Sequence, residues 1–136
     1  MLLLSKYKKV DPIKWSQRHI SLDYGSFKPE FHPLLVEPLQ ALADSRGKTV
    51  GLIGSVQHIK TLLAQMWHLY CLQVEPGRAA MYDLTEAALK EFSDDKFTPL
   101  IDSTDAVLNL IPDQPYRRTK FYTSTNFGAI RLLSAN

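Results

Sequence analysis

One stretch constrains the fold of this 136-residue chain more than any other: an apolar run, a short polar loop ending in Lys60-Thr61, and a second apolar run. The first run, Lys48 to Gly54, has the length and composition of a strand buried on both sides in a parallel sheet. From Thr61 to Leu72, apolar residues recur at helical spacing. A strand, a tight loop and a helix in this order are typical of a phosphate-binding loop, so the sequence predicts an α/β domain.

The loop departs from the pattern G-x-x-x-x-G-K-[ST] at one position, because Ile59 stands where the second glycine belongs. A branched side chain there crowds both the turn and a bound phosphate. In an intact loop the lysine contacts phosphate and the hydroxyl holds Mg²⁺, which are the roles we expect for Lys60 and Thr61. Gly54 permits the turn and Gln57 can donate a hydrogen bond. An ordinary strand-to-helix turn with an exposed lysine remains the alternative.

The rest of the chain divides into two parts. Residues 1–32 carry scattered aromatic and basic residues, with a short helix expected only around 11–19, and predict an irregular N-terminal wrap. Residues 33–136 form the main domain. Its expected elements are a helix over 34–44, a strand over 79–84, a helix opened by Thr85, a short helical piece from 98, and a hairpin of strands 119–124 and 129–134.

Composition narrows the class of protein further. A hydrophobic content of 45% over this length predicts a single core. Cys71 is the only cysteine, which excludes an intrachain disulfide and indicates a reducing compartment. No apolar run approaches the ~18 residues of a membrane span, and no signal peptide is recognisable. The four histidines lack zinc-ligand spacing, so we expect no structural metal.

Several blocks, in order, carry a resemblance to a known family. They are the proline-led helix Pro33 to Leu42, the deviant loop with Ser55-Val56-Gln57 and Lys60-Thr61, the junction Leu84 to Ala87, the segment Phe92 to Ile101, and the end Gly128 to Asn136. Together they resemble the N-terminal part of the ATPase domain of phage terminase large subunits of the lambda-like GpA family. No block is specific alone, and the likeness rests on their order over nearly the whole chain.

The resemblance implies a partial P-loop NTPase core of the ASCE type, with three layers, parallel strands, helices on both faces and a C-terminal hairpin. It implies ATP and Mg²⁺ as cofactors, bound through Gly54, Ser55, Gln57, Lys60 and Thr61. The implied partners are double-stranded DNA, the terminase small subunit and the portal of the procapsid, in the host cytoplasm and without a membrane, with a homo-oligomer as a further option. The family's acidic strand end and nuclease carboxylates would follow residue 136, so we expect ATP binding without turnover by this chain alone.

Two other functions stay open: a degenerate, non-catalytic phage interaction module, and a P-loop ATPase or helicase relative outside packaging. The family supplies an aromatic platform for adenine, for which the available residues here are Trp15, Tyr24, Phe27 and Phe31. The same rings could simply pack the wrap onto the domain. A basic and aromatic mixture over 116–122 predicts either contact with DNA or an ordinary strand with rings inward, and the basic head over 6–28 either approaches nucleic acid or is solvated.

Overall fold

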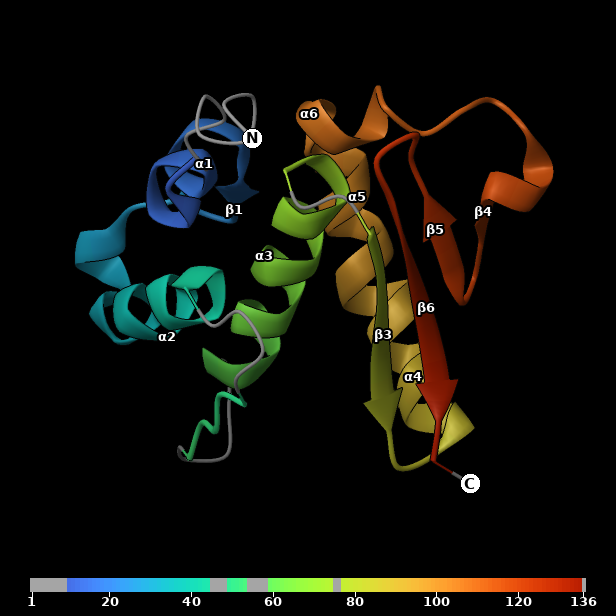
Figure 1. Ribbon diagram of the computed structural model, residues 1–136, viewed down its shortest axis with the longest axis horizontal. Coiled ribbons are helices and arrows are strands. Elements are labelled where there is room, and N and C mark those ends of the chain that lie inside the picture. Colours follow the sequence, from blue (N-terminus) through green and yellow to red (C-terminus); the bar gives the residue numbers. More distant parts are fainter. Residues whose placement is uncertain (1–9, 45–48, 54–58, 75–76, 136) are drawn as a thin grey trace, which may run out of the picture.

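The computed structural model describes residues 10–44, 49–53, 59–74 and 77–135 (Figure 1). In chain order the elements are α1 (Pro12–His19), β1 (Ser21–Leu22), β2 (Gly25–Ser26), the 3₁₀ turn η1 (Pro29–Phe31), α2 (Pro33–Asp44), α3 (Ile59–Gln73), β3 (Gly77–Asp83), α4 (Glu86–Phe92), the π-helical turn η2 (Ser93–Phe97), α5 (Thr98–Ser103), α6 (Asp105–Leu108), the 3₁₀ turn η3 (Pro115–Arg117), β4 (Arg118–Thr119), β5 (Tyr122–Ser124) and β6 (Gly128–Ser134). The domain is therefore mixed α/β, as the sequence predicts.

The helices begin where local signals place them. Asp11 caps α1 by accepting a hydrogen bond from the amide of Ile13 at 2.8 Å. Thr85 caps α4 by accepting from the amide of Ala88 at 3.2 Å, and Glu86 adds an acidic residue to the first turn. The expected helices near 11–19 and 34–44 are confirmed as α1 and α2. Pro38 lies inside α2, beyond the first turn in which a helix tolerates proline best.

Helix α3 lies between the N-terminal helices α1 and α2 on one side and the sheet on the other (Figure 1). Its residues Met66, Leu69, Tyr70 and Leu72 are fully buried. Each such side chain contributes roughly 1.5–3 kcal/mol by leaving water, which makes α3 the centre of the core. From the other side, Trp15 of α1 packs edge-on against the Tyr70 ring at 5.7 Å between centroids.

The four-stranded sheet has the order β3-β6-β5-β4 and is mixed. β3 and β6 run parallel in a register that pairs Gly77 with Gly128 and Asp83 with Ser134. β5 and β6 form the expected antiparallel hairpin, closed by the amide of Thr125 donating to the carbonyl of Gly128 at 2.8 Å. The single strand predicted over 119–124 is wrong, because the chain turns at 120–121 and pairs β4 with β5.

The strand predicted over Lys48 to Gly54 is also wrong wherever the structure describes it. Residues 49–53 form neither helix nor strand, and Ile53 is fully exposed. Lys48 and Gly54 lie outside the described residues. An apolar run of this length forms a buried strand only if it pairs with another strand of a sheet. The described sheet does not include this run.

The helices cover one face of the sheet, called here the inner face. Ile130 and Leu132 of β6 are buried there, and the half-buried Ala79 and Met81 of β3 lie beside them in register. On the outer face Arg131 is exposed and Tyr82 retains 66% of its exposure. For the described residues, the prediction of helices on both faces is therefore wrong. β3 alternates in burial, as a strand with one solvated face does.

Candidate functional site

A cavity of about 1110 Å³ opens at the amino end of α3. Its volume is slightly above the usual range of ligand pockets, which is roughly 300–1,000 Å³. Three parts of the chain form its walls: the β1–β2 hairpin with His32, the first turns of α3, and the segment from η2 into α5. The lining residues are Ser21, Leu22, Asp23, Tyr24, His32, Lys60, Thr61, Leu62, Gln65, Asp95, Lys96, Pro99, Leu100 and Ser103.

The α3 wall contributes Lys60 and Thr61 from the first turn of a 15-residue helix. Lys60 is exposed and Thr61 is half-buried. The first amides of a helix have no intrahelical partner, and the aligned peptide dipoles place partial positive charge at this end. An ammonium group and a hydroxyl beside such amides form a setting that suits an anion.

The hairpin wall is aromatic. Tyr24 is stacked with His32 at 5.7 Å and 26° between ring planes, and His32 is stacked with the buried Phe27 at 5.8 Å. The Phe31 ring meets Tyr24 edge-on at 5.1 Å. Tyr24 keeps 42% of its exposure, so part of its ring is open to a ligand. Gly25, with a φ of +112°, allows the tight turn that presents Tyr24.

One polar atom in this wall lacks a partner. Nε2 of His32 is buried, and no hydrogen-bond partner for it exists among the described residues. A buried polar atom without a partner costs about 1–3 kcal/mol. Such atoms call for an explanation, and a ligand or water in the adjoining cavity would supply one.

The third wall is one that the sequence did not reveal. Asp95 and Lys96 belong to the π-helical turn η2, which follows α4 without a break. Turns of π-helix occur often at functional sites. No residue pattern in the sequence indicates that Asp95 lines the same cavity as Lys60. Only the tertiary fold brings this wall to the cavity.

Only some of the predicted site residues lie in the part of the chain that the structure describes. Lys60 and Thr61 both line the cavity, whereas Gly54, Ser55 and Gln57 lie outside the described residues. Ile59, the residue that breaks the loop pattern, begins α3 and is half-buried against the core. Its side chain therefore has a packing role at this position. The roles of the five predicted residues toward a nucleotide stay predictions.

The basic residues near 117–120 have partners within the protein. Arg118 forms an ion pair with Asp102 of α5 at 2.7 Å, and Lys120 forms one with Asp94 of η2 at 2.9 Å. The guanidinium of Arg117 donates to the carbonyl of Thr125 at 3.3 Å. The two ion pairs fasten the β4–β5 hairpin to the helices that follow β3, and the Arg117 hydrogen bond holds it to the β5–β6 turn. They accord with the interpretation of this segment as part of the sheet.

Two titratable groups on α3 are perturbed. Burial raises the pKa of Tyr70 to about 12, with Cys71 and Asp11 adding smaller effects in the same direction. Tyr70 thus stays protonated and donates to the carbonyl of Val10 at 2.6 Å. Burial lowers the pKa of His68 below 6.5, opposed by a weaker effect of its hydrogen bond to the Ala64 carbonyl. Neither group lines the cavity.

Within the described ranges, no three histidine, cysteine, aspartate or glutamate side chains gather as a metal site. In the same part of the chain, no helix has the length and apolar character needed to cross a bilayer.

The fold and the cavity define a mixed α/β domain with a ligand-sized pocket at a helix amino end. Comparison with known families identifies it further: the sequence matches the family described as the ATPase domain of phage terminase large subunit gpA over residues 21–135. The chain belongs to this family. No curated protein and no solved structure gives a significant match.

Proposed function

We propose that the chain binds ATP with Mg²⁺ in the cavity at the amino end of α3, as the ATPase domain of a DNA-packaging terminase large subunit. One observation carries the proposal: the cavity joins Lys60 and Thr61, predicted from the loop pattern, to a ring platform that could take a base. Membership of a terminase ATPase family supports the choice of ATP.

We propose that the phosphates and the base of the nucleotide contact different walls of the cavity. The phosphates would lie against the α3 amides, with Lys60 contributing its ammonium group, and we propose Gly54, Ser55 and Gln57 as further phosphate-binding residues. The adenine would stack on Tyr24, the one of the four aromatic candidates that lines the cavity. Lys96 adds a second positive charge on the η2 wall.

Magnesium fits as an ion held largely by the nucleotide. Mg²⁺ is commonly bound by one or two protein oxygen ligands together with phosphates and water. Thr61 is the hydroxyl we propose for it, and the carboxylates Asp23 and Asp95 line the same cavity. With no bound cation these two carboxylates would repel phosphate, so the proposal requires ATP binding to depend on Mg²⁺.

Family membership also supports a proposal for the wider assembly. We propose double-stranded DNA, the terminase small subunit and the portal of the procapsid as partners, acting in the host cytoplasm. In a terminase large subunit, ATP hydrolysis would drive DNA translocation. We propose that this chain supplies the ATP-binding step, with residues 33–136 as the ATPase part and 1–32 as the segment that wraps it.

Titration calorimetry with MgATP tests the binding site. Lys60→Ala should weaken binding at least tenfold, because it removes the ammonium group carried by the first turn of α3. Lys90→Ala is the matched control: Lys90 is an exposed lysine on α4 that does not line the cavity, so its loss should leave the affinity unchanged. Tyr24→Ala should weaken ATP more than inorganic triphosphate. No heat at millimolar MgATP with the natural chain would refute the proposal.

A second function has one observation in its favour. Ile59 packs against the core at the position where an intact loop needs glycine, which suits a degenerate module that binds a packaging partner without nucleotide. Ile59→Gly separates the two functions. A large gain in ATP affinity would show that the natural loop is impaired, whereas equal affinities would show that the loop tolerates isoleucine.

A further inference from the structure

The edge strand β3 carries an inference that is independent of nucleotide binding. In the described residues β3 ends the sheet, with β6 as its one neighbour (Figure 1). The amide of Gly77 donates to the carbonyl of Phe127 at 3.1 Å, and the carbonyl of Asp83 accepts from Ala135 at 2.8 Å. The odd-numbered residues of β3 therefore direct their backbone groups toward β6.

Backbone groups alternate in direction along a strand. The amides and carbonyls of Arg78, Ala80 and Tyr82 must then point away from β6, at the edge of the sheet. The side chains of these three residues are exposed on the outer face. The strand is seven residues long and contains no lysine, no proline and no bulge in its register, which are the usual devices that protect an edge from pairing.

We propose that two copies of the chain pair through β3, antiparallel, with the two-fold axis at Ala80. Only residues whose backbone points outward can form the closely hydrogen-bonded pairs, so Arg78, Ala80 and Tyr82 set the register. Centring on Ala80 overlaps the whole strand. It gives about six hydrogen bonds, two for each outward-pointing pair.

This register makes the strand complementary to itself. Arg78 of one copy lies opposite Tyr82 of the other on the outer face, and the arrangement occurs twice because of the two-fold axis. An arginine above a tyrosine ring contributes about 0.5–1 kcal/mol at an exposed site. The same face already holds one such pair, with the Arg131 guanidinium 5.0 Å from the Tyr122 ring centroid. At the axis, Ala80 faces Ala80 and brings no bulk.

The dimer should be weak. A single pair of strands buries less than the standard interface of roughly 1,600 Å², so dissociation in the micromolar range is expected. Sedimentation velocity on the 136-residue chain should show a concentration-dependent monomer–dimer equilibrium. A chain that remains monomeric at several hundred micromolar, roughly a hundredfold above the expected constant, would overturn the proposal.

Crosslinking tests the axis. In a Cys71→Ser background, Ala80→Cys should be joined to itself by a short bis-maleimide, because hydrogen-bonded partners lie about 5.5 Å apart at Cα. Ala129→Cys is the control on the neighbouring strand and the same face. In the dimer its two copies are about 20 Å apart, because three strand spacings (about 14 Å) separate them across the sheet and four residues (about 13 Å) along the strands, so they should crosslink far less. Equal crosslinking at both positions would overturn the proposed axis.

Two sets of variants test the pairing. Tyr82→Arg places two arginines opposite each other and should weaken the dimer at least tenfold, while the double variant Arg78→Tyr/Tyr82→Arg restores the complementary pair and should recover it. Ala80→Pro removes an outward-pointing amide and should abolish the dimer, whereas Ala80→Ser retains that amide and should not. Circular dichroism checks folding, and the swap remains decisive if the proline variant unfolds. Failure of the swap to rescue, or a dimer unaffected by Tyr82→Arg, would place the interface elsewhere.

Discussion

The hydroxyl of Thr125 joins the carboxyl end of α3 to the β5–β6 turn, and its removal should destabilise the fold. The side chain is only 5% exposed. Its Oγ1 donates to the carbonyl of Leu72 at 2.8 Å and accepts from the amides of Phe127 at 3.1 Å and Gly128 at 3.2 Å. Thr125→Val preserves the branched shape and removes all of these bonds at once.

The expected cost follows from the groups left behind. Valine fills the space of threonine, so no cavity term arises. An orphaned buried group costs about 1–3 kcal/mol, and the Leu72 carbonyl is the one whose hydrogen bond is fully buried. The two amides are partly buried and add less. We expect a loss of about 2–3 kcal/mol in the free energy of unfolding, which at a urea slope of about 2 kcal/mol/M lowers the midpoint by roughly 1–1.5 M.

Urea unfolding followed by circular dichroism measures this loss. Thr125→Ser keeps the hydroxyl and should retain most of the stability. Thr119→Val makes the same chemical change at an exposed residue of β4 and should stay within about 0.5 kcal/mol of the natural chain. If Thr125→Val also stayed within that margin, the three backbone groups would be satisfied by water and the argument from buried hydrogen bonds would fail.

Three further outcomes follow from the packing and charges. Trp15→Ala should cost about 3–5 kcal/mol in urea unfolding, because the ring packs on Tyr70; a loss under 1 kcal/mol would show that α1 is not part of the core. Since burial lowers the pKa of His68 in the folded state, stability should be complete above pH 6.5 and fall as the pH drops toward the lowered value; His68→Gln should flatten that dependence, and an unchanged slope would contradict it. Asp102→Asn should cost less than about 1 kcal/mol, and less again in high salt, because both side chains of the pair with Arg118 are partly solvated; a larger loss would show that the pair is effectively buried.

Elements with local signals could be predicted from the sequence. The helical spacing from Thr61 to Leu72 predicted α3, which extends a few residues further, to Ile59–Gln73. The Thr85 cap marked the start of α4, and residues 125–128 marked the turn of the final hairpin. In each case the information lies within a few residues, where capping bonds and side-chain periodicity act.

Elements that depend on a distant partner could not be predicted. β6 pairs with β3, about fifty residues earlier, and nothing in Gly128 to Ser134 specifies a parallel neighbour. Residues 49–53 have strand composition without a strand partner in the described sheet. The turn at 120–121 splits a stretch of good strand formers, because Lys120 pairs with Asp94 and its carbonyl accepts from Ser93 at 2.5 Å. Tertiary contacts outweigh local preference there.

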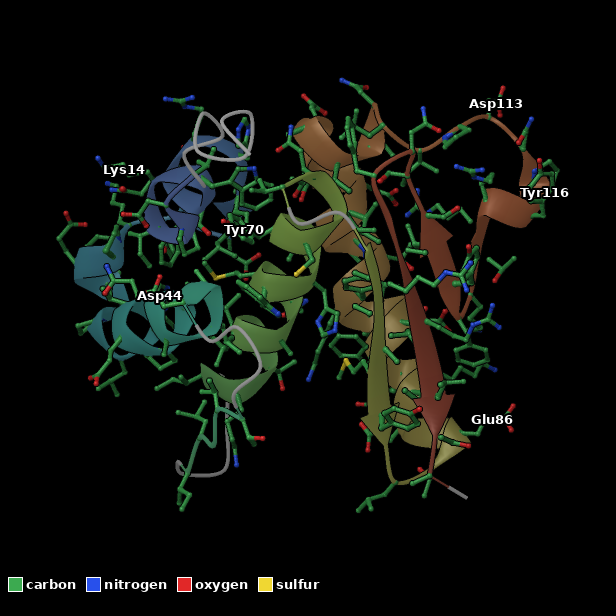
Figure 2. The ribbon with its side chains drawn as sticks, in the orientation of Figure 1. Lys14, Asp44, Tyr70, Glu86, Asp113 and Tyr116 are labelled. Carbon is green, nitrogen blue, oxygen red and sulfur yellow. The ribbon has the colours of Figure 1, made fainter. Side chains whose placement is uncertain are left out.

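In the candidate site, too, some residues could be predicted from the sequence and others could not. The loop pattern led to Lys60 and Thr61, and the family resemblance implied a base platform for which Tyr24 was one of four available rings. His32 and Lys96 were missed because they join the cavity only through folding (Figure 2 shows the side chains around α3). A sequence motif identifies the phosphate-contacting residues because they are consecutive at the amino end of one helix. The other cavity walls come from separate segments of the chain, so no motif with fixed spacing identifies them.

Burial along α3 relates the core to the site. The carboxyl half of the helix holds the fully buried Met66, Leu69 and Leu72 and is tied to the sheet through Thr125. The first turn is half-buried or exposed, and it carries Lys60 and Thr61. Local stability follows buried apolar contact, so the anchored end fixes the helix axis while the cavity end retains freedom to adjust. A ligand that bound only the folded first turn would stabilise the chain by mass action. The added stability would be greatest at the amino end of α3, where the fewest side chains are buried.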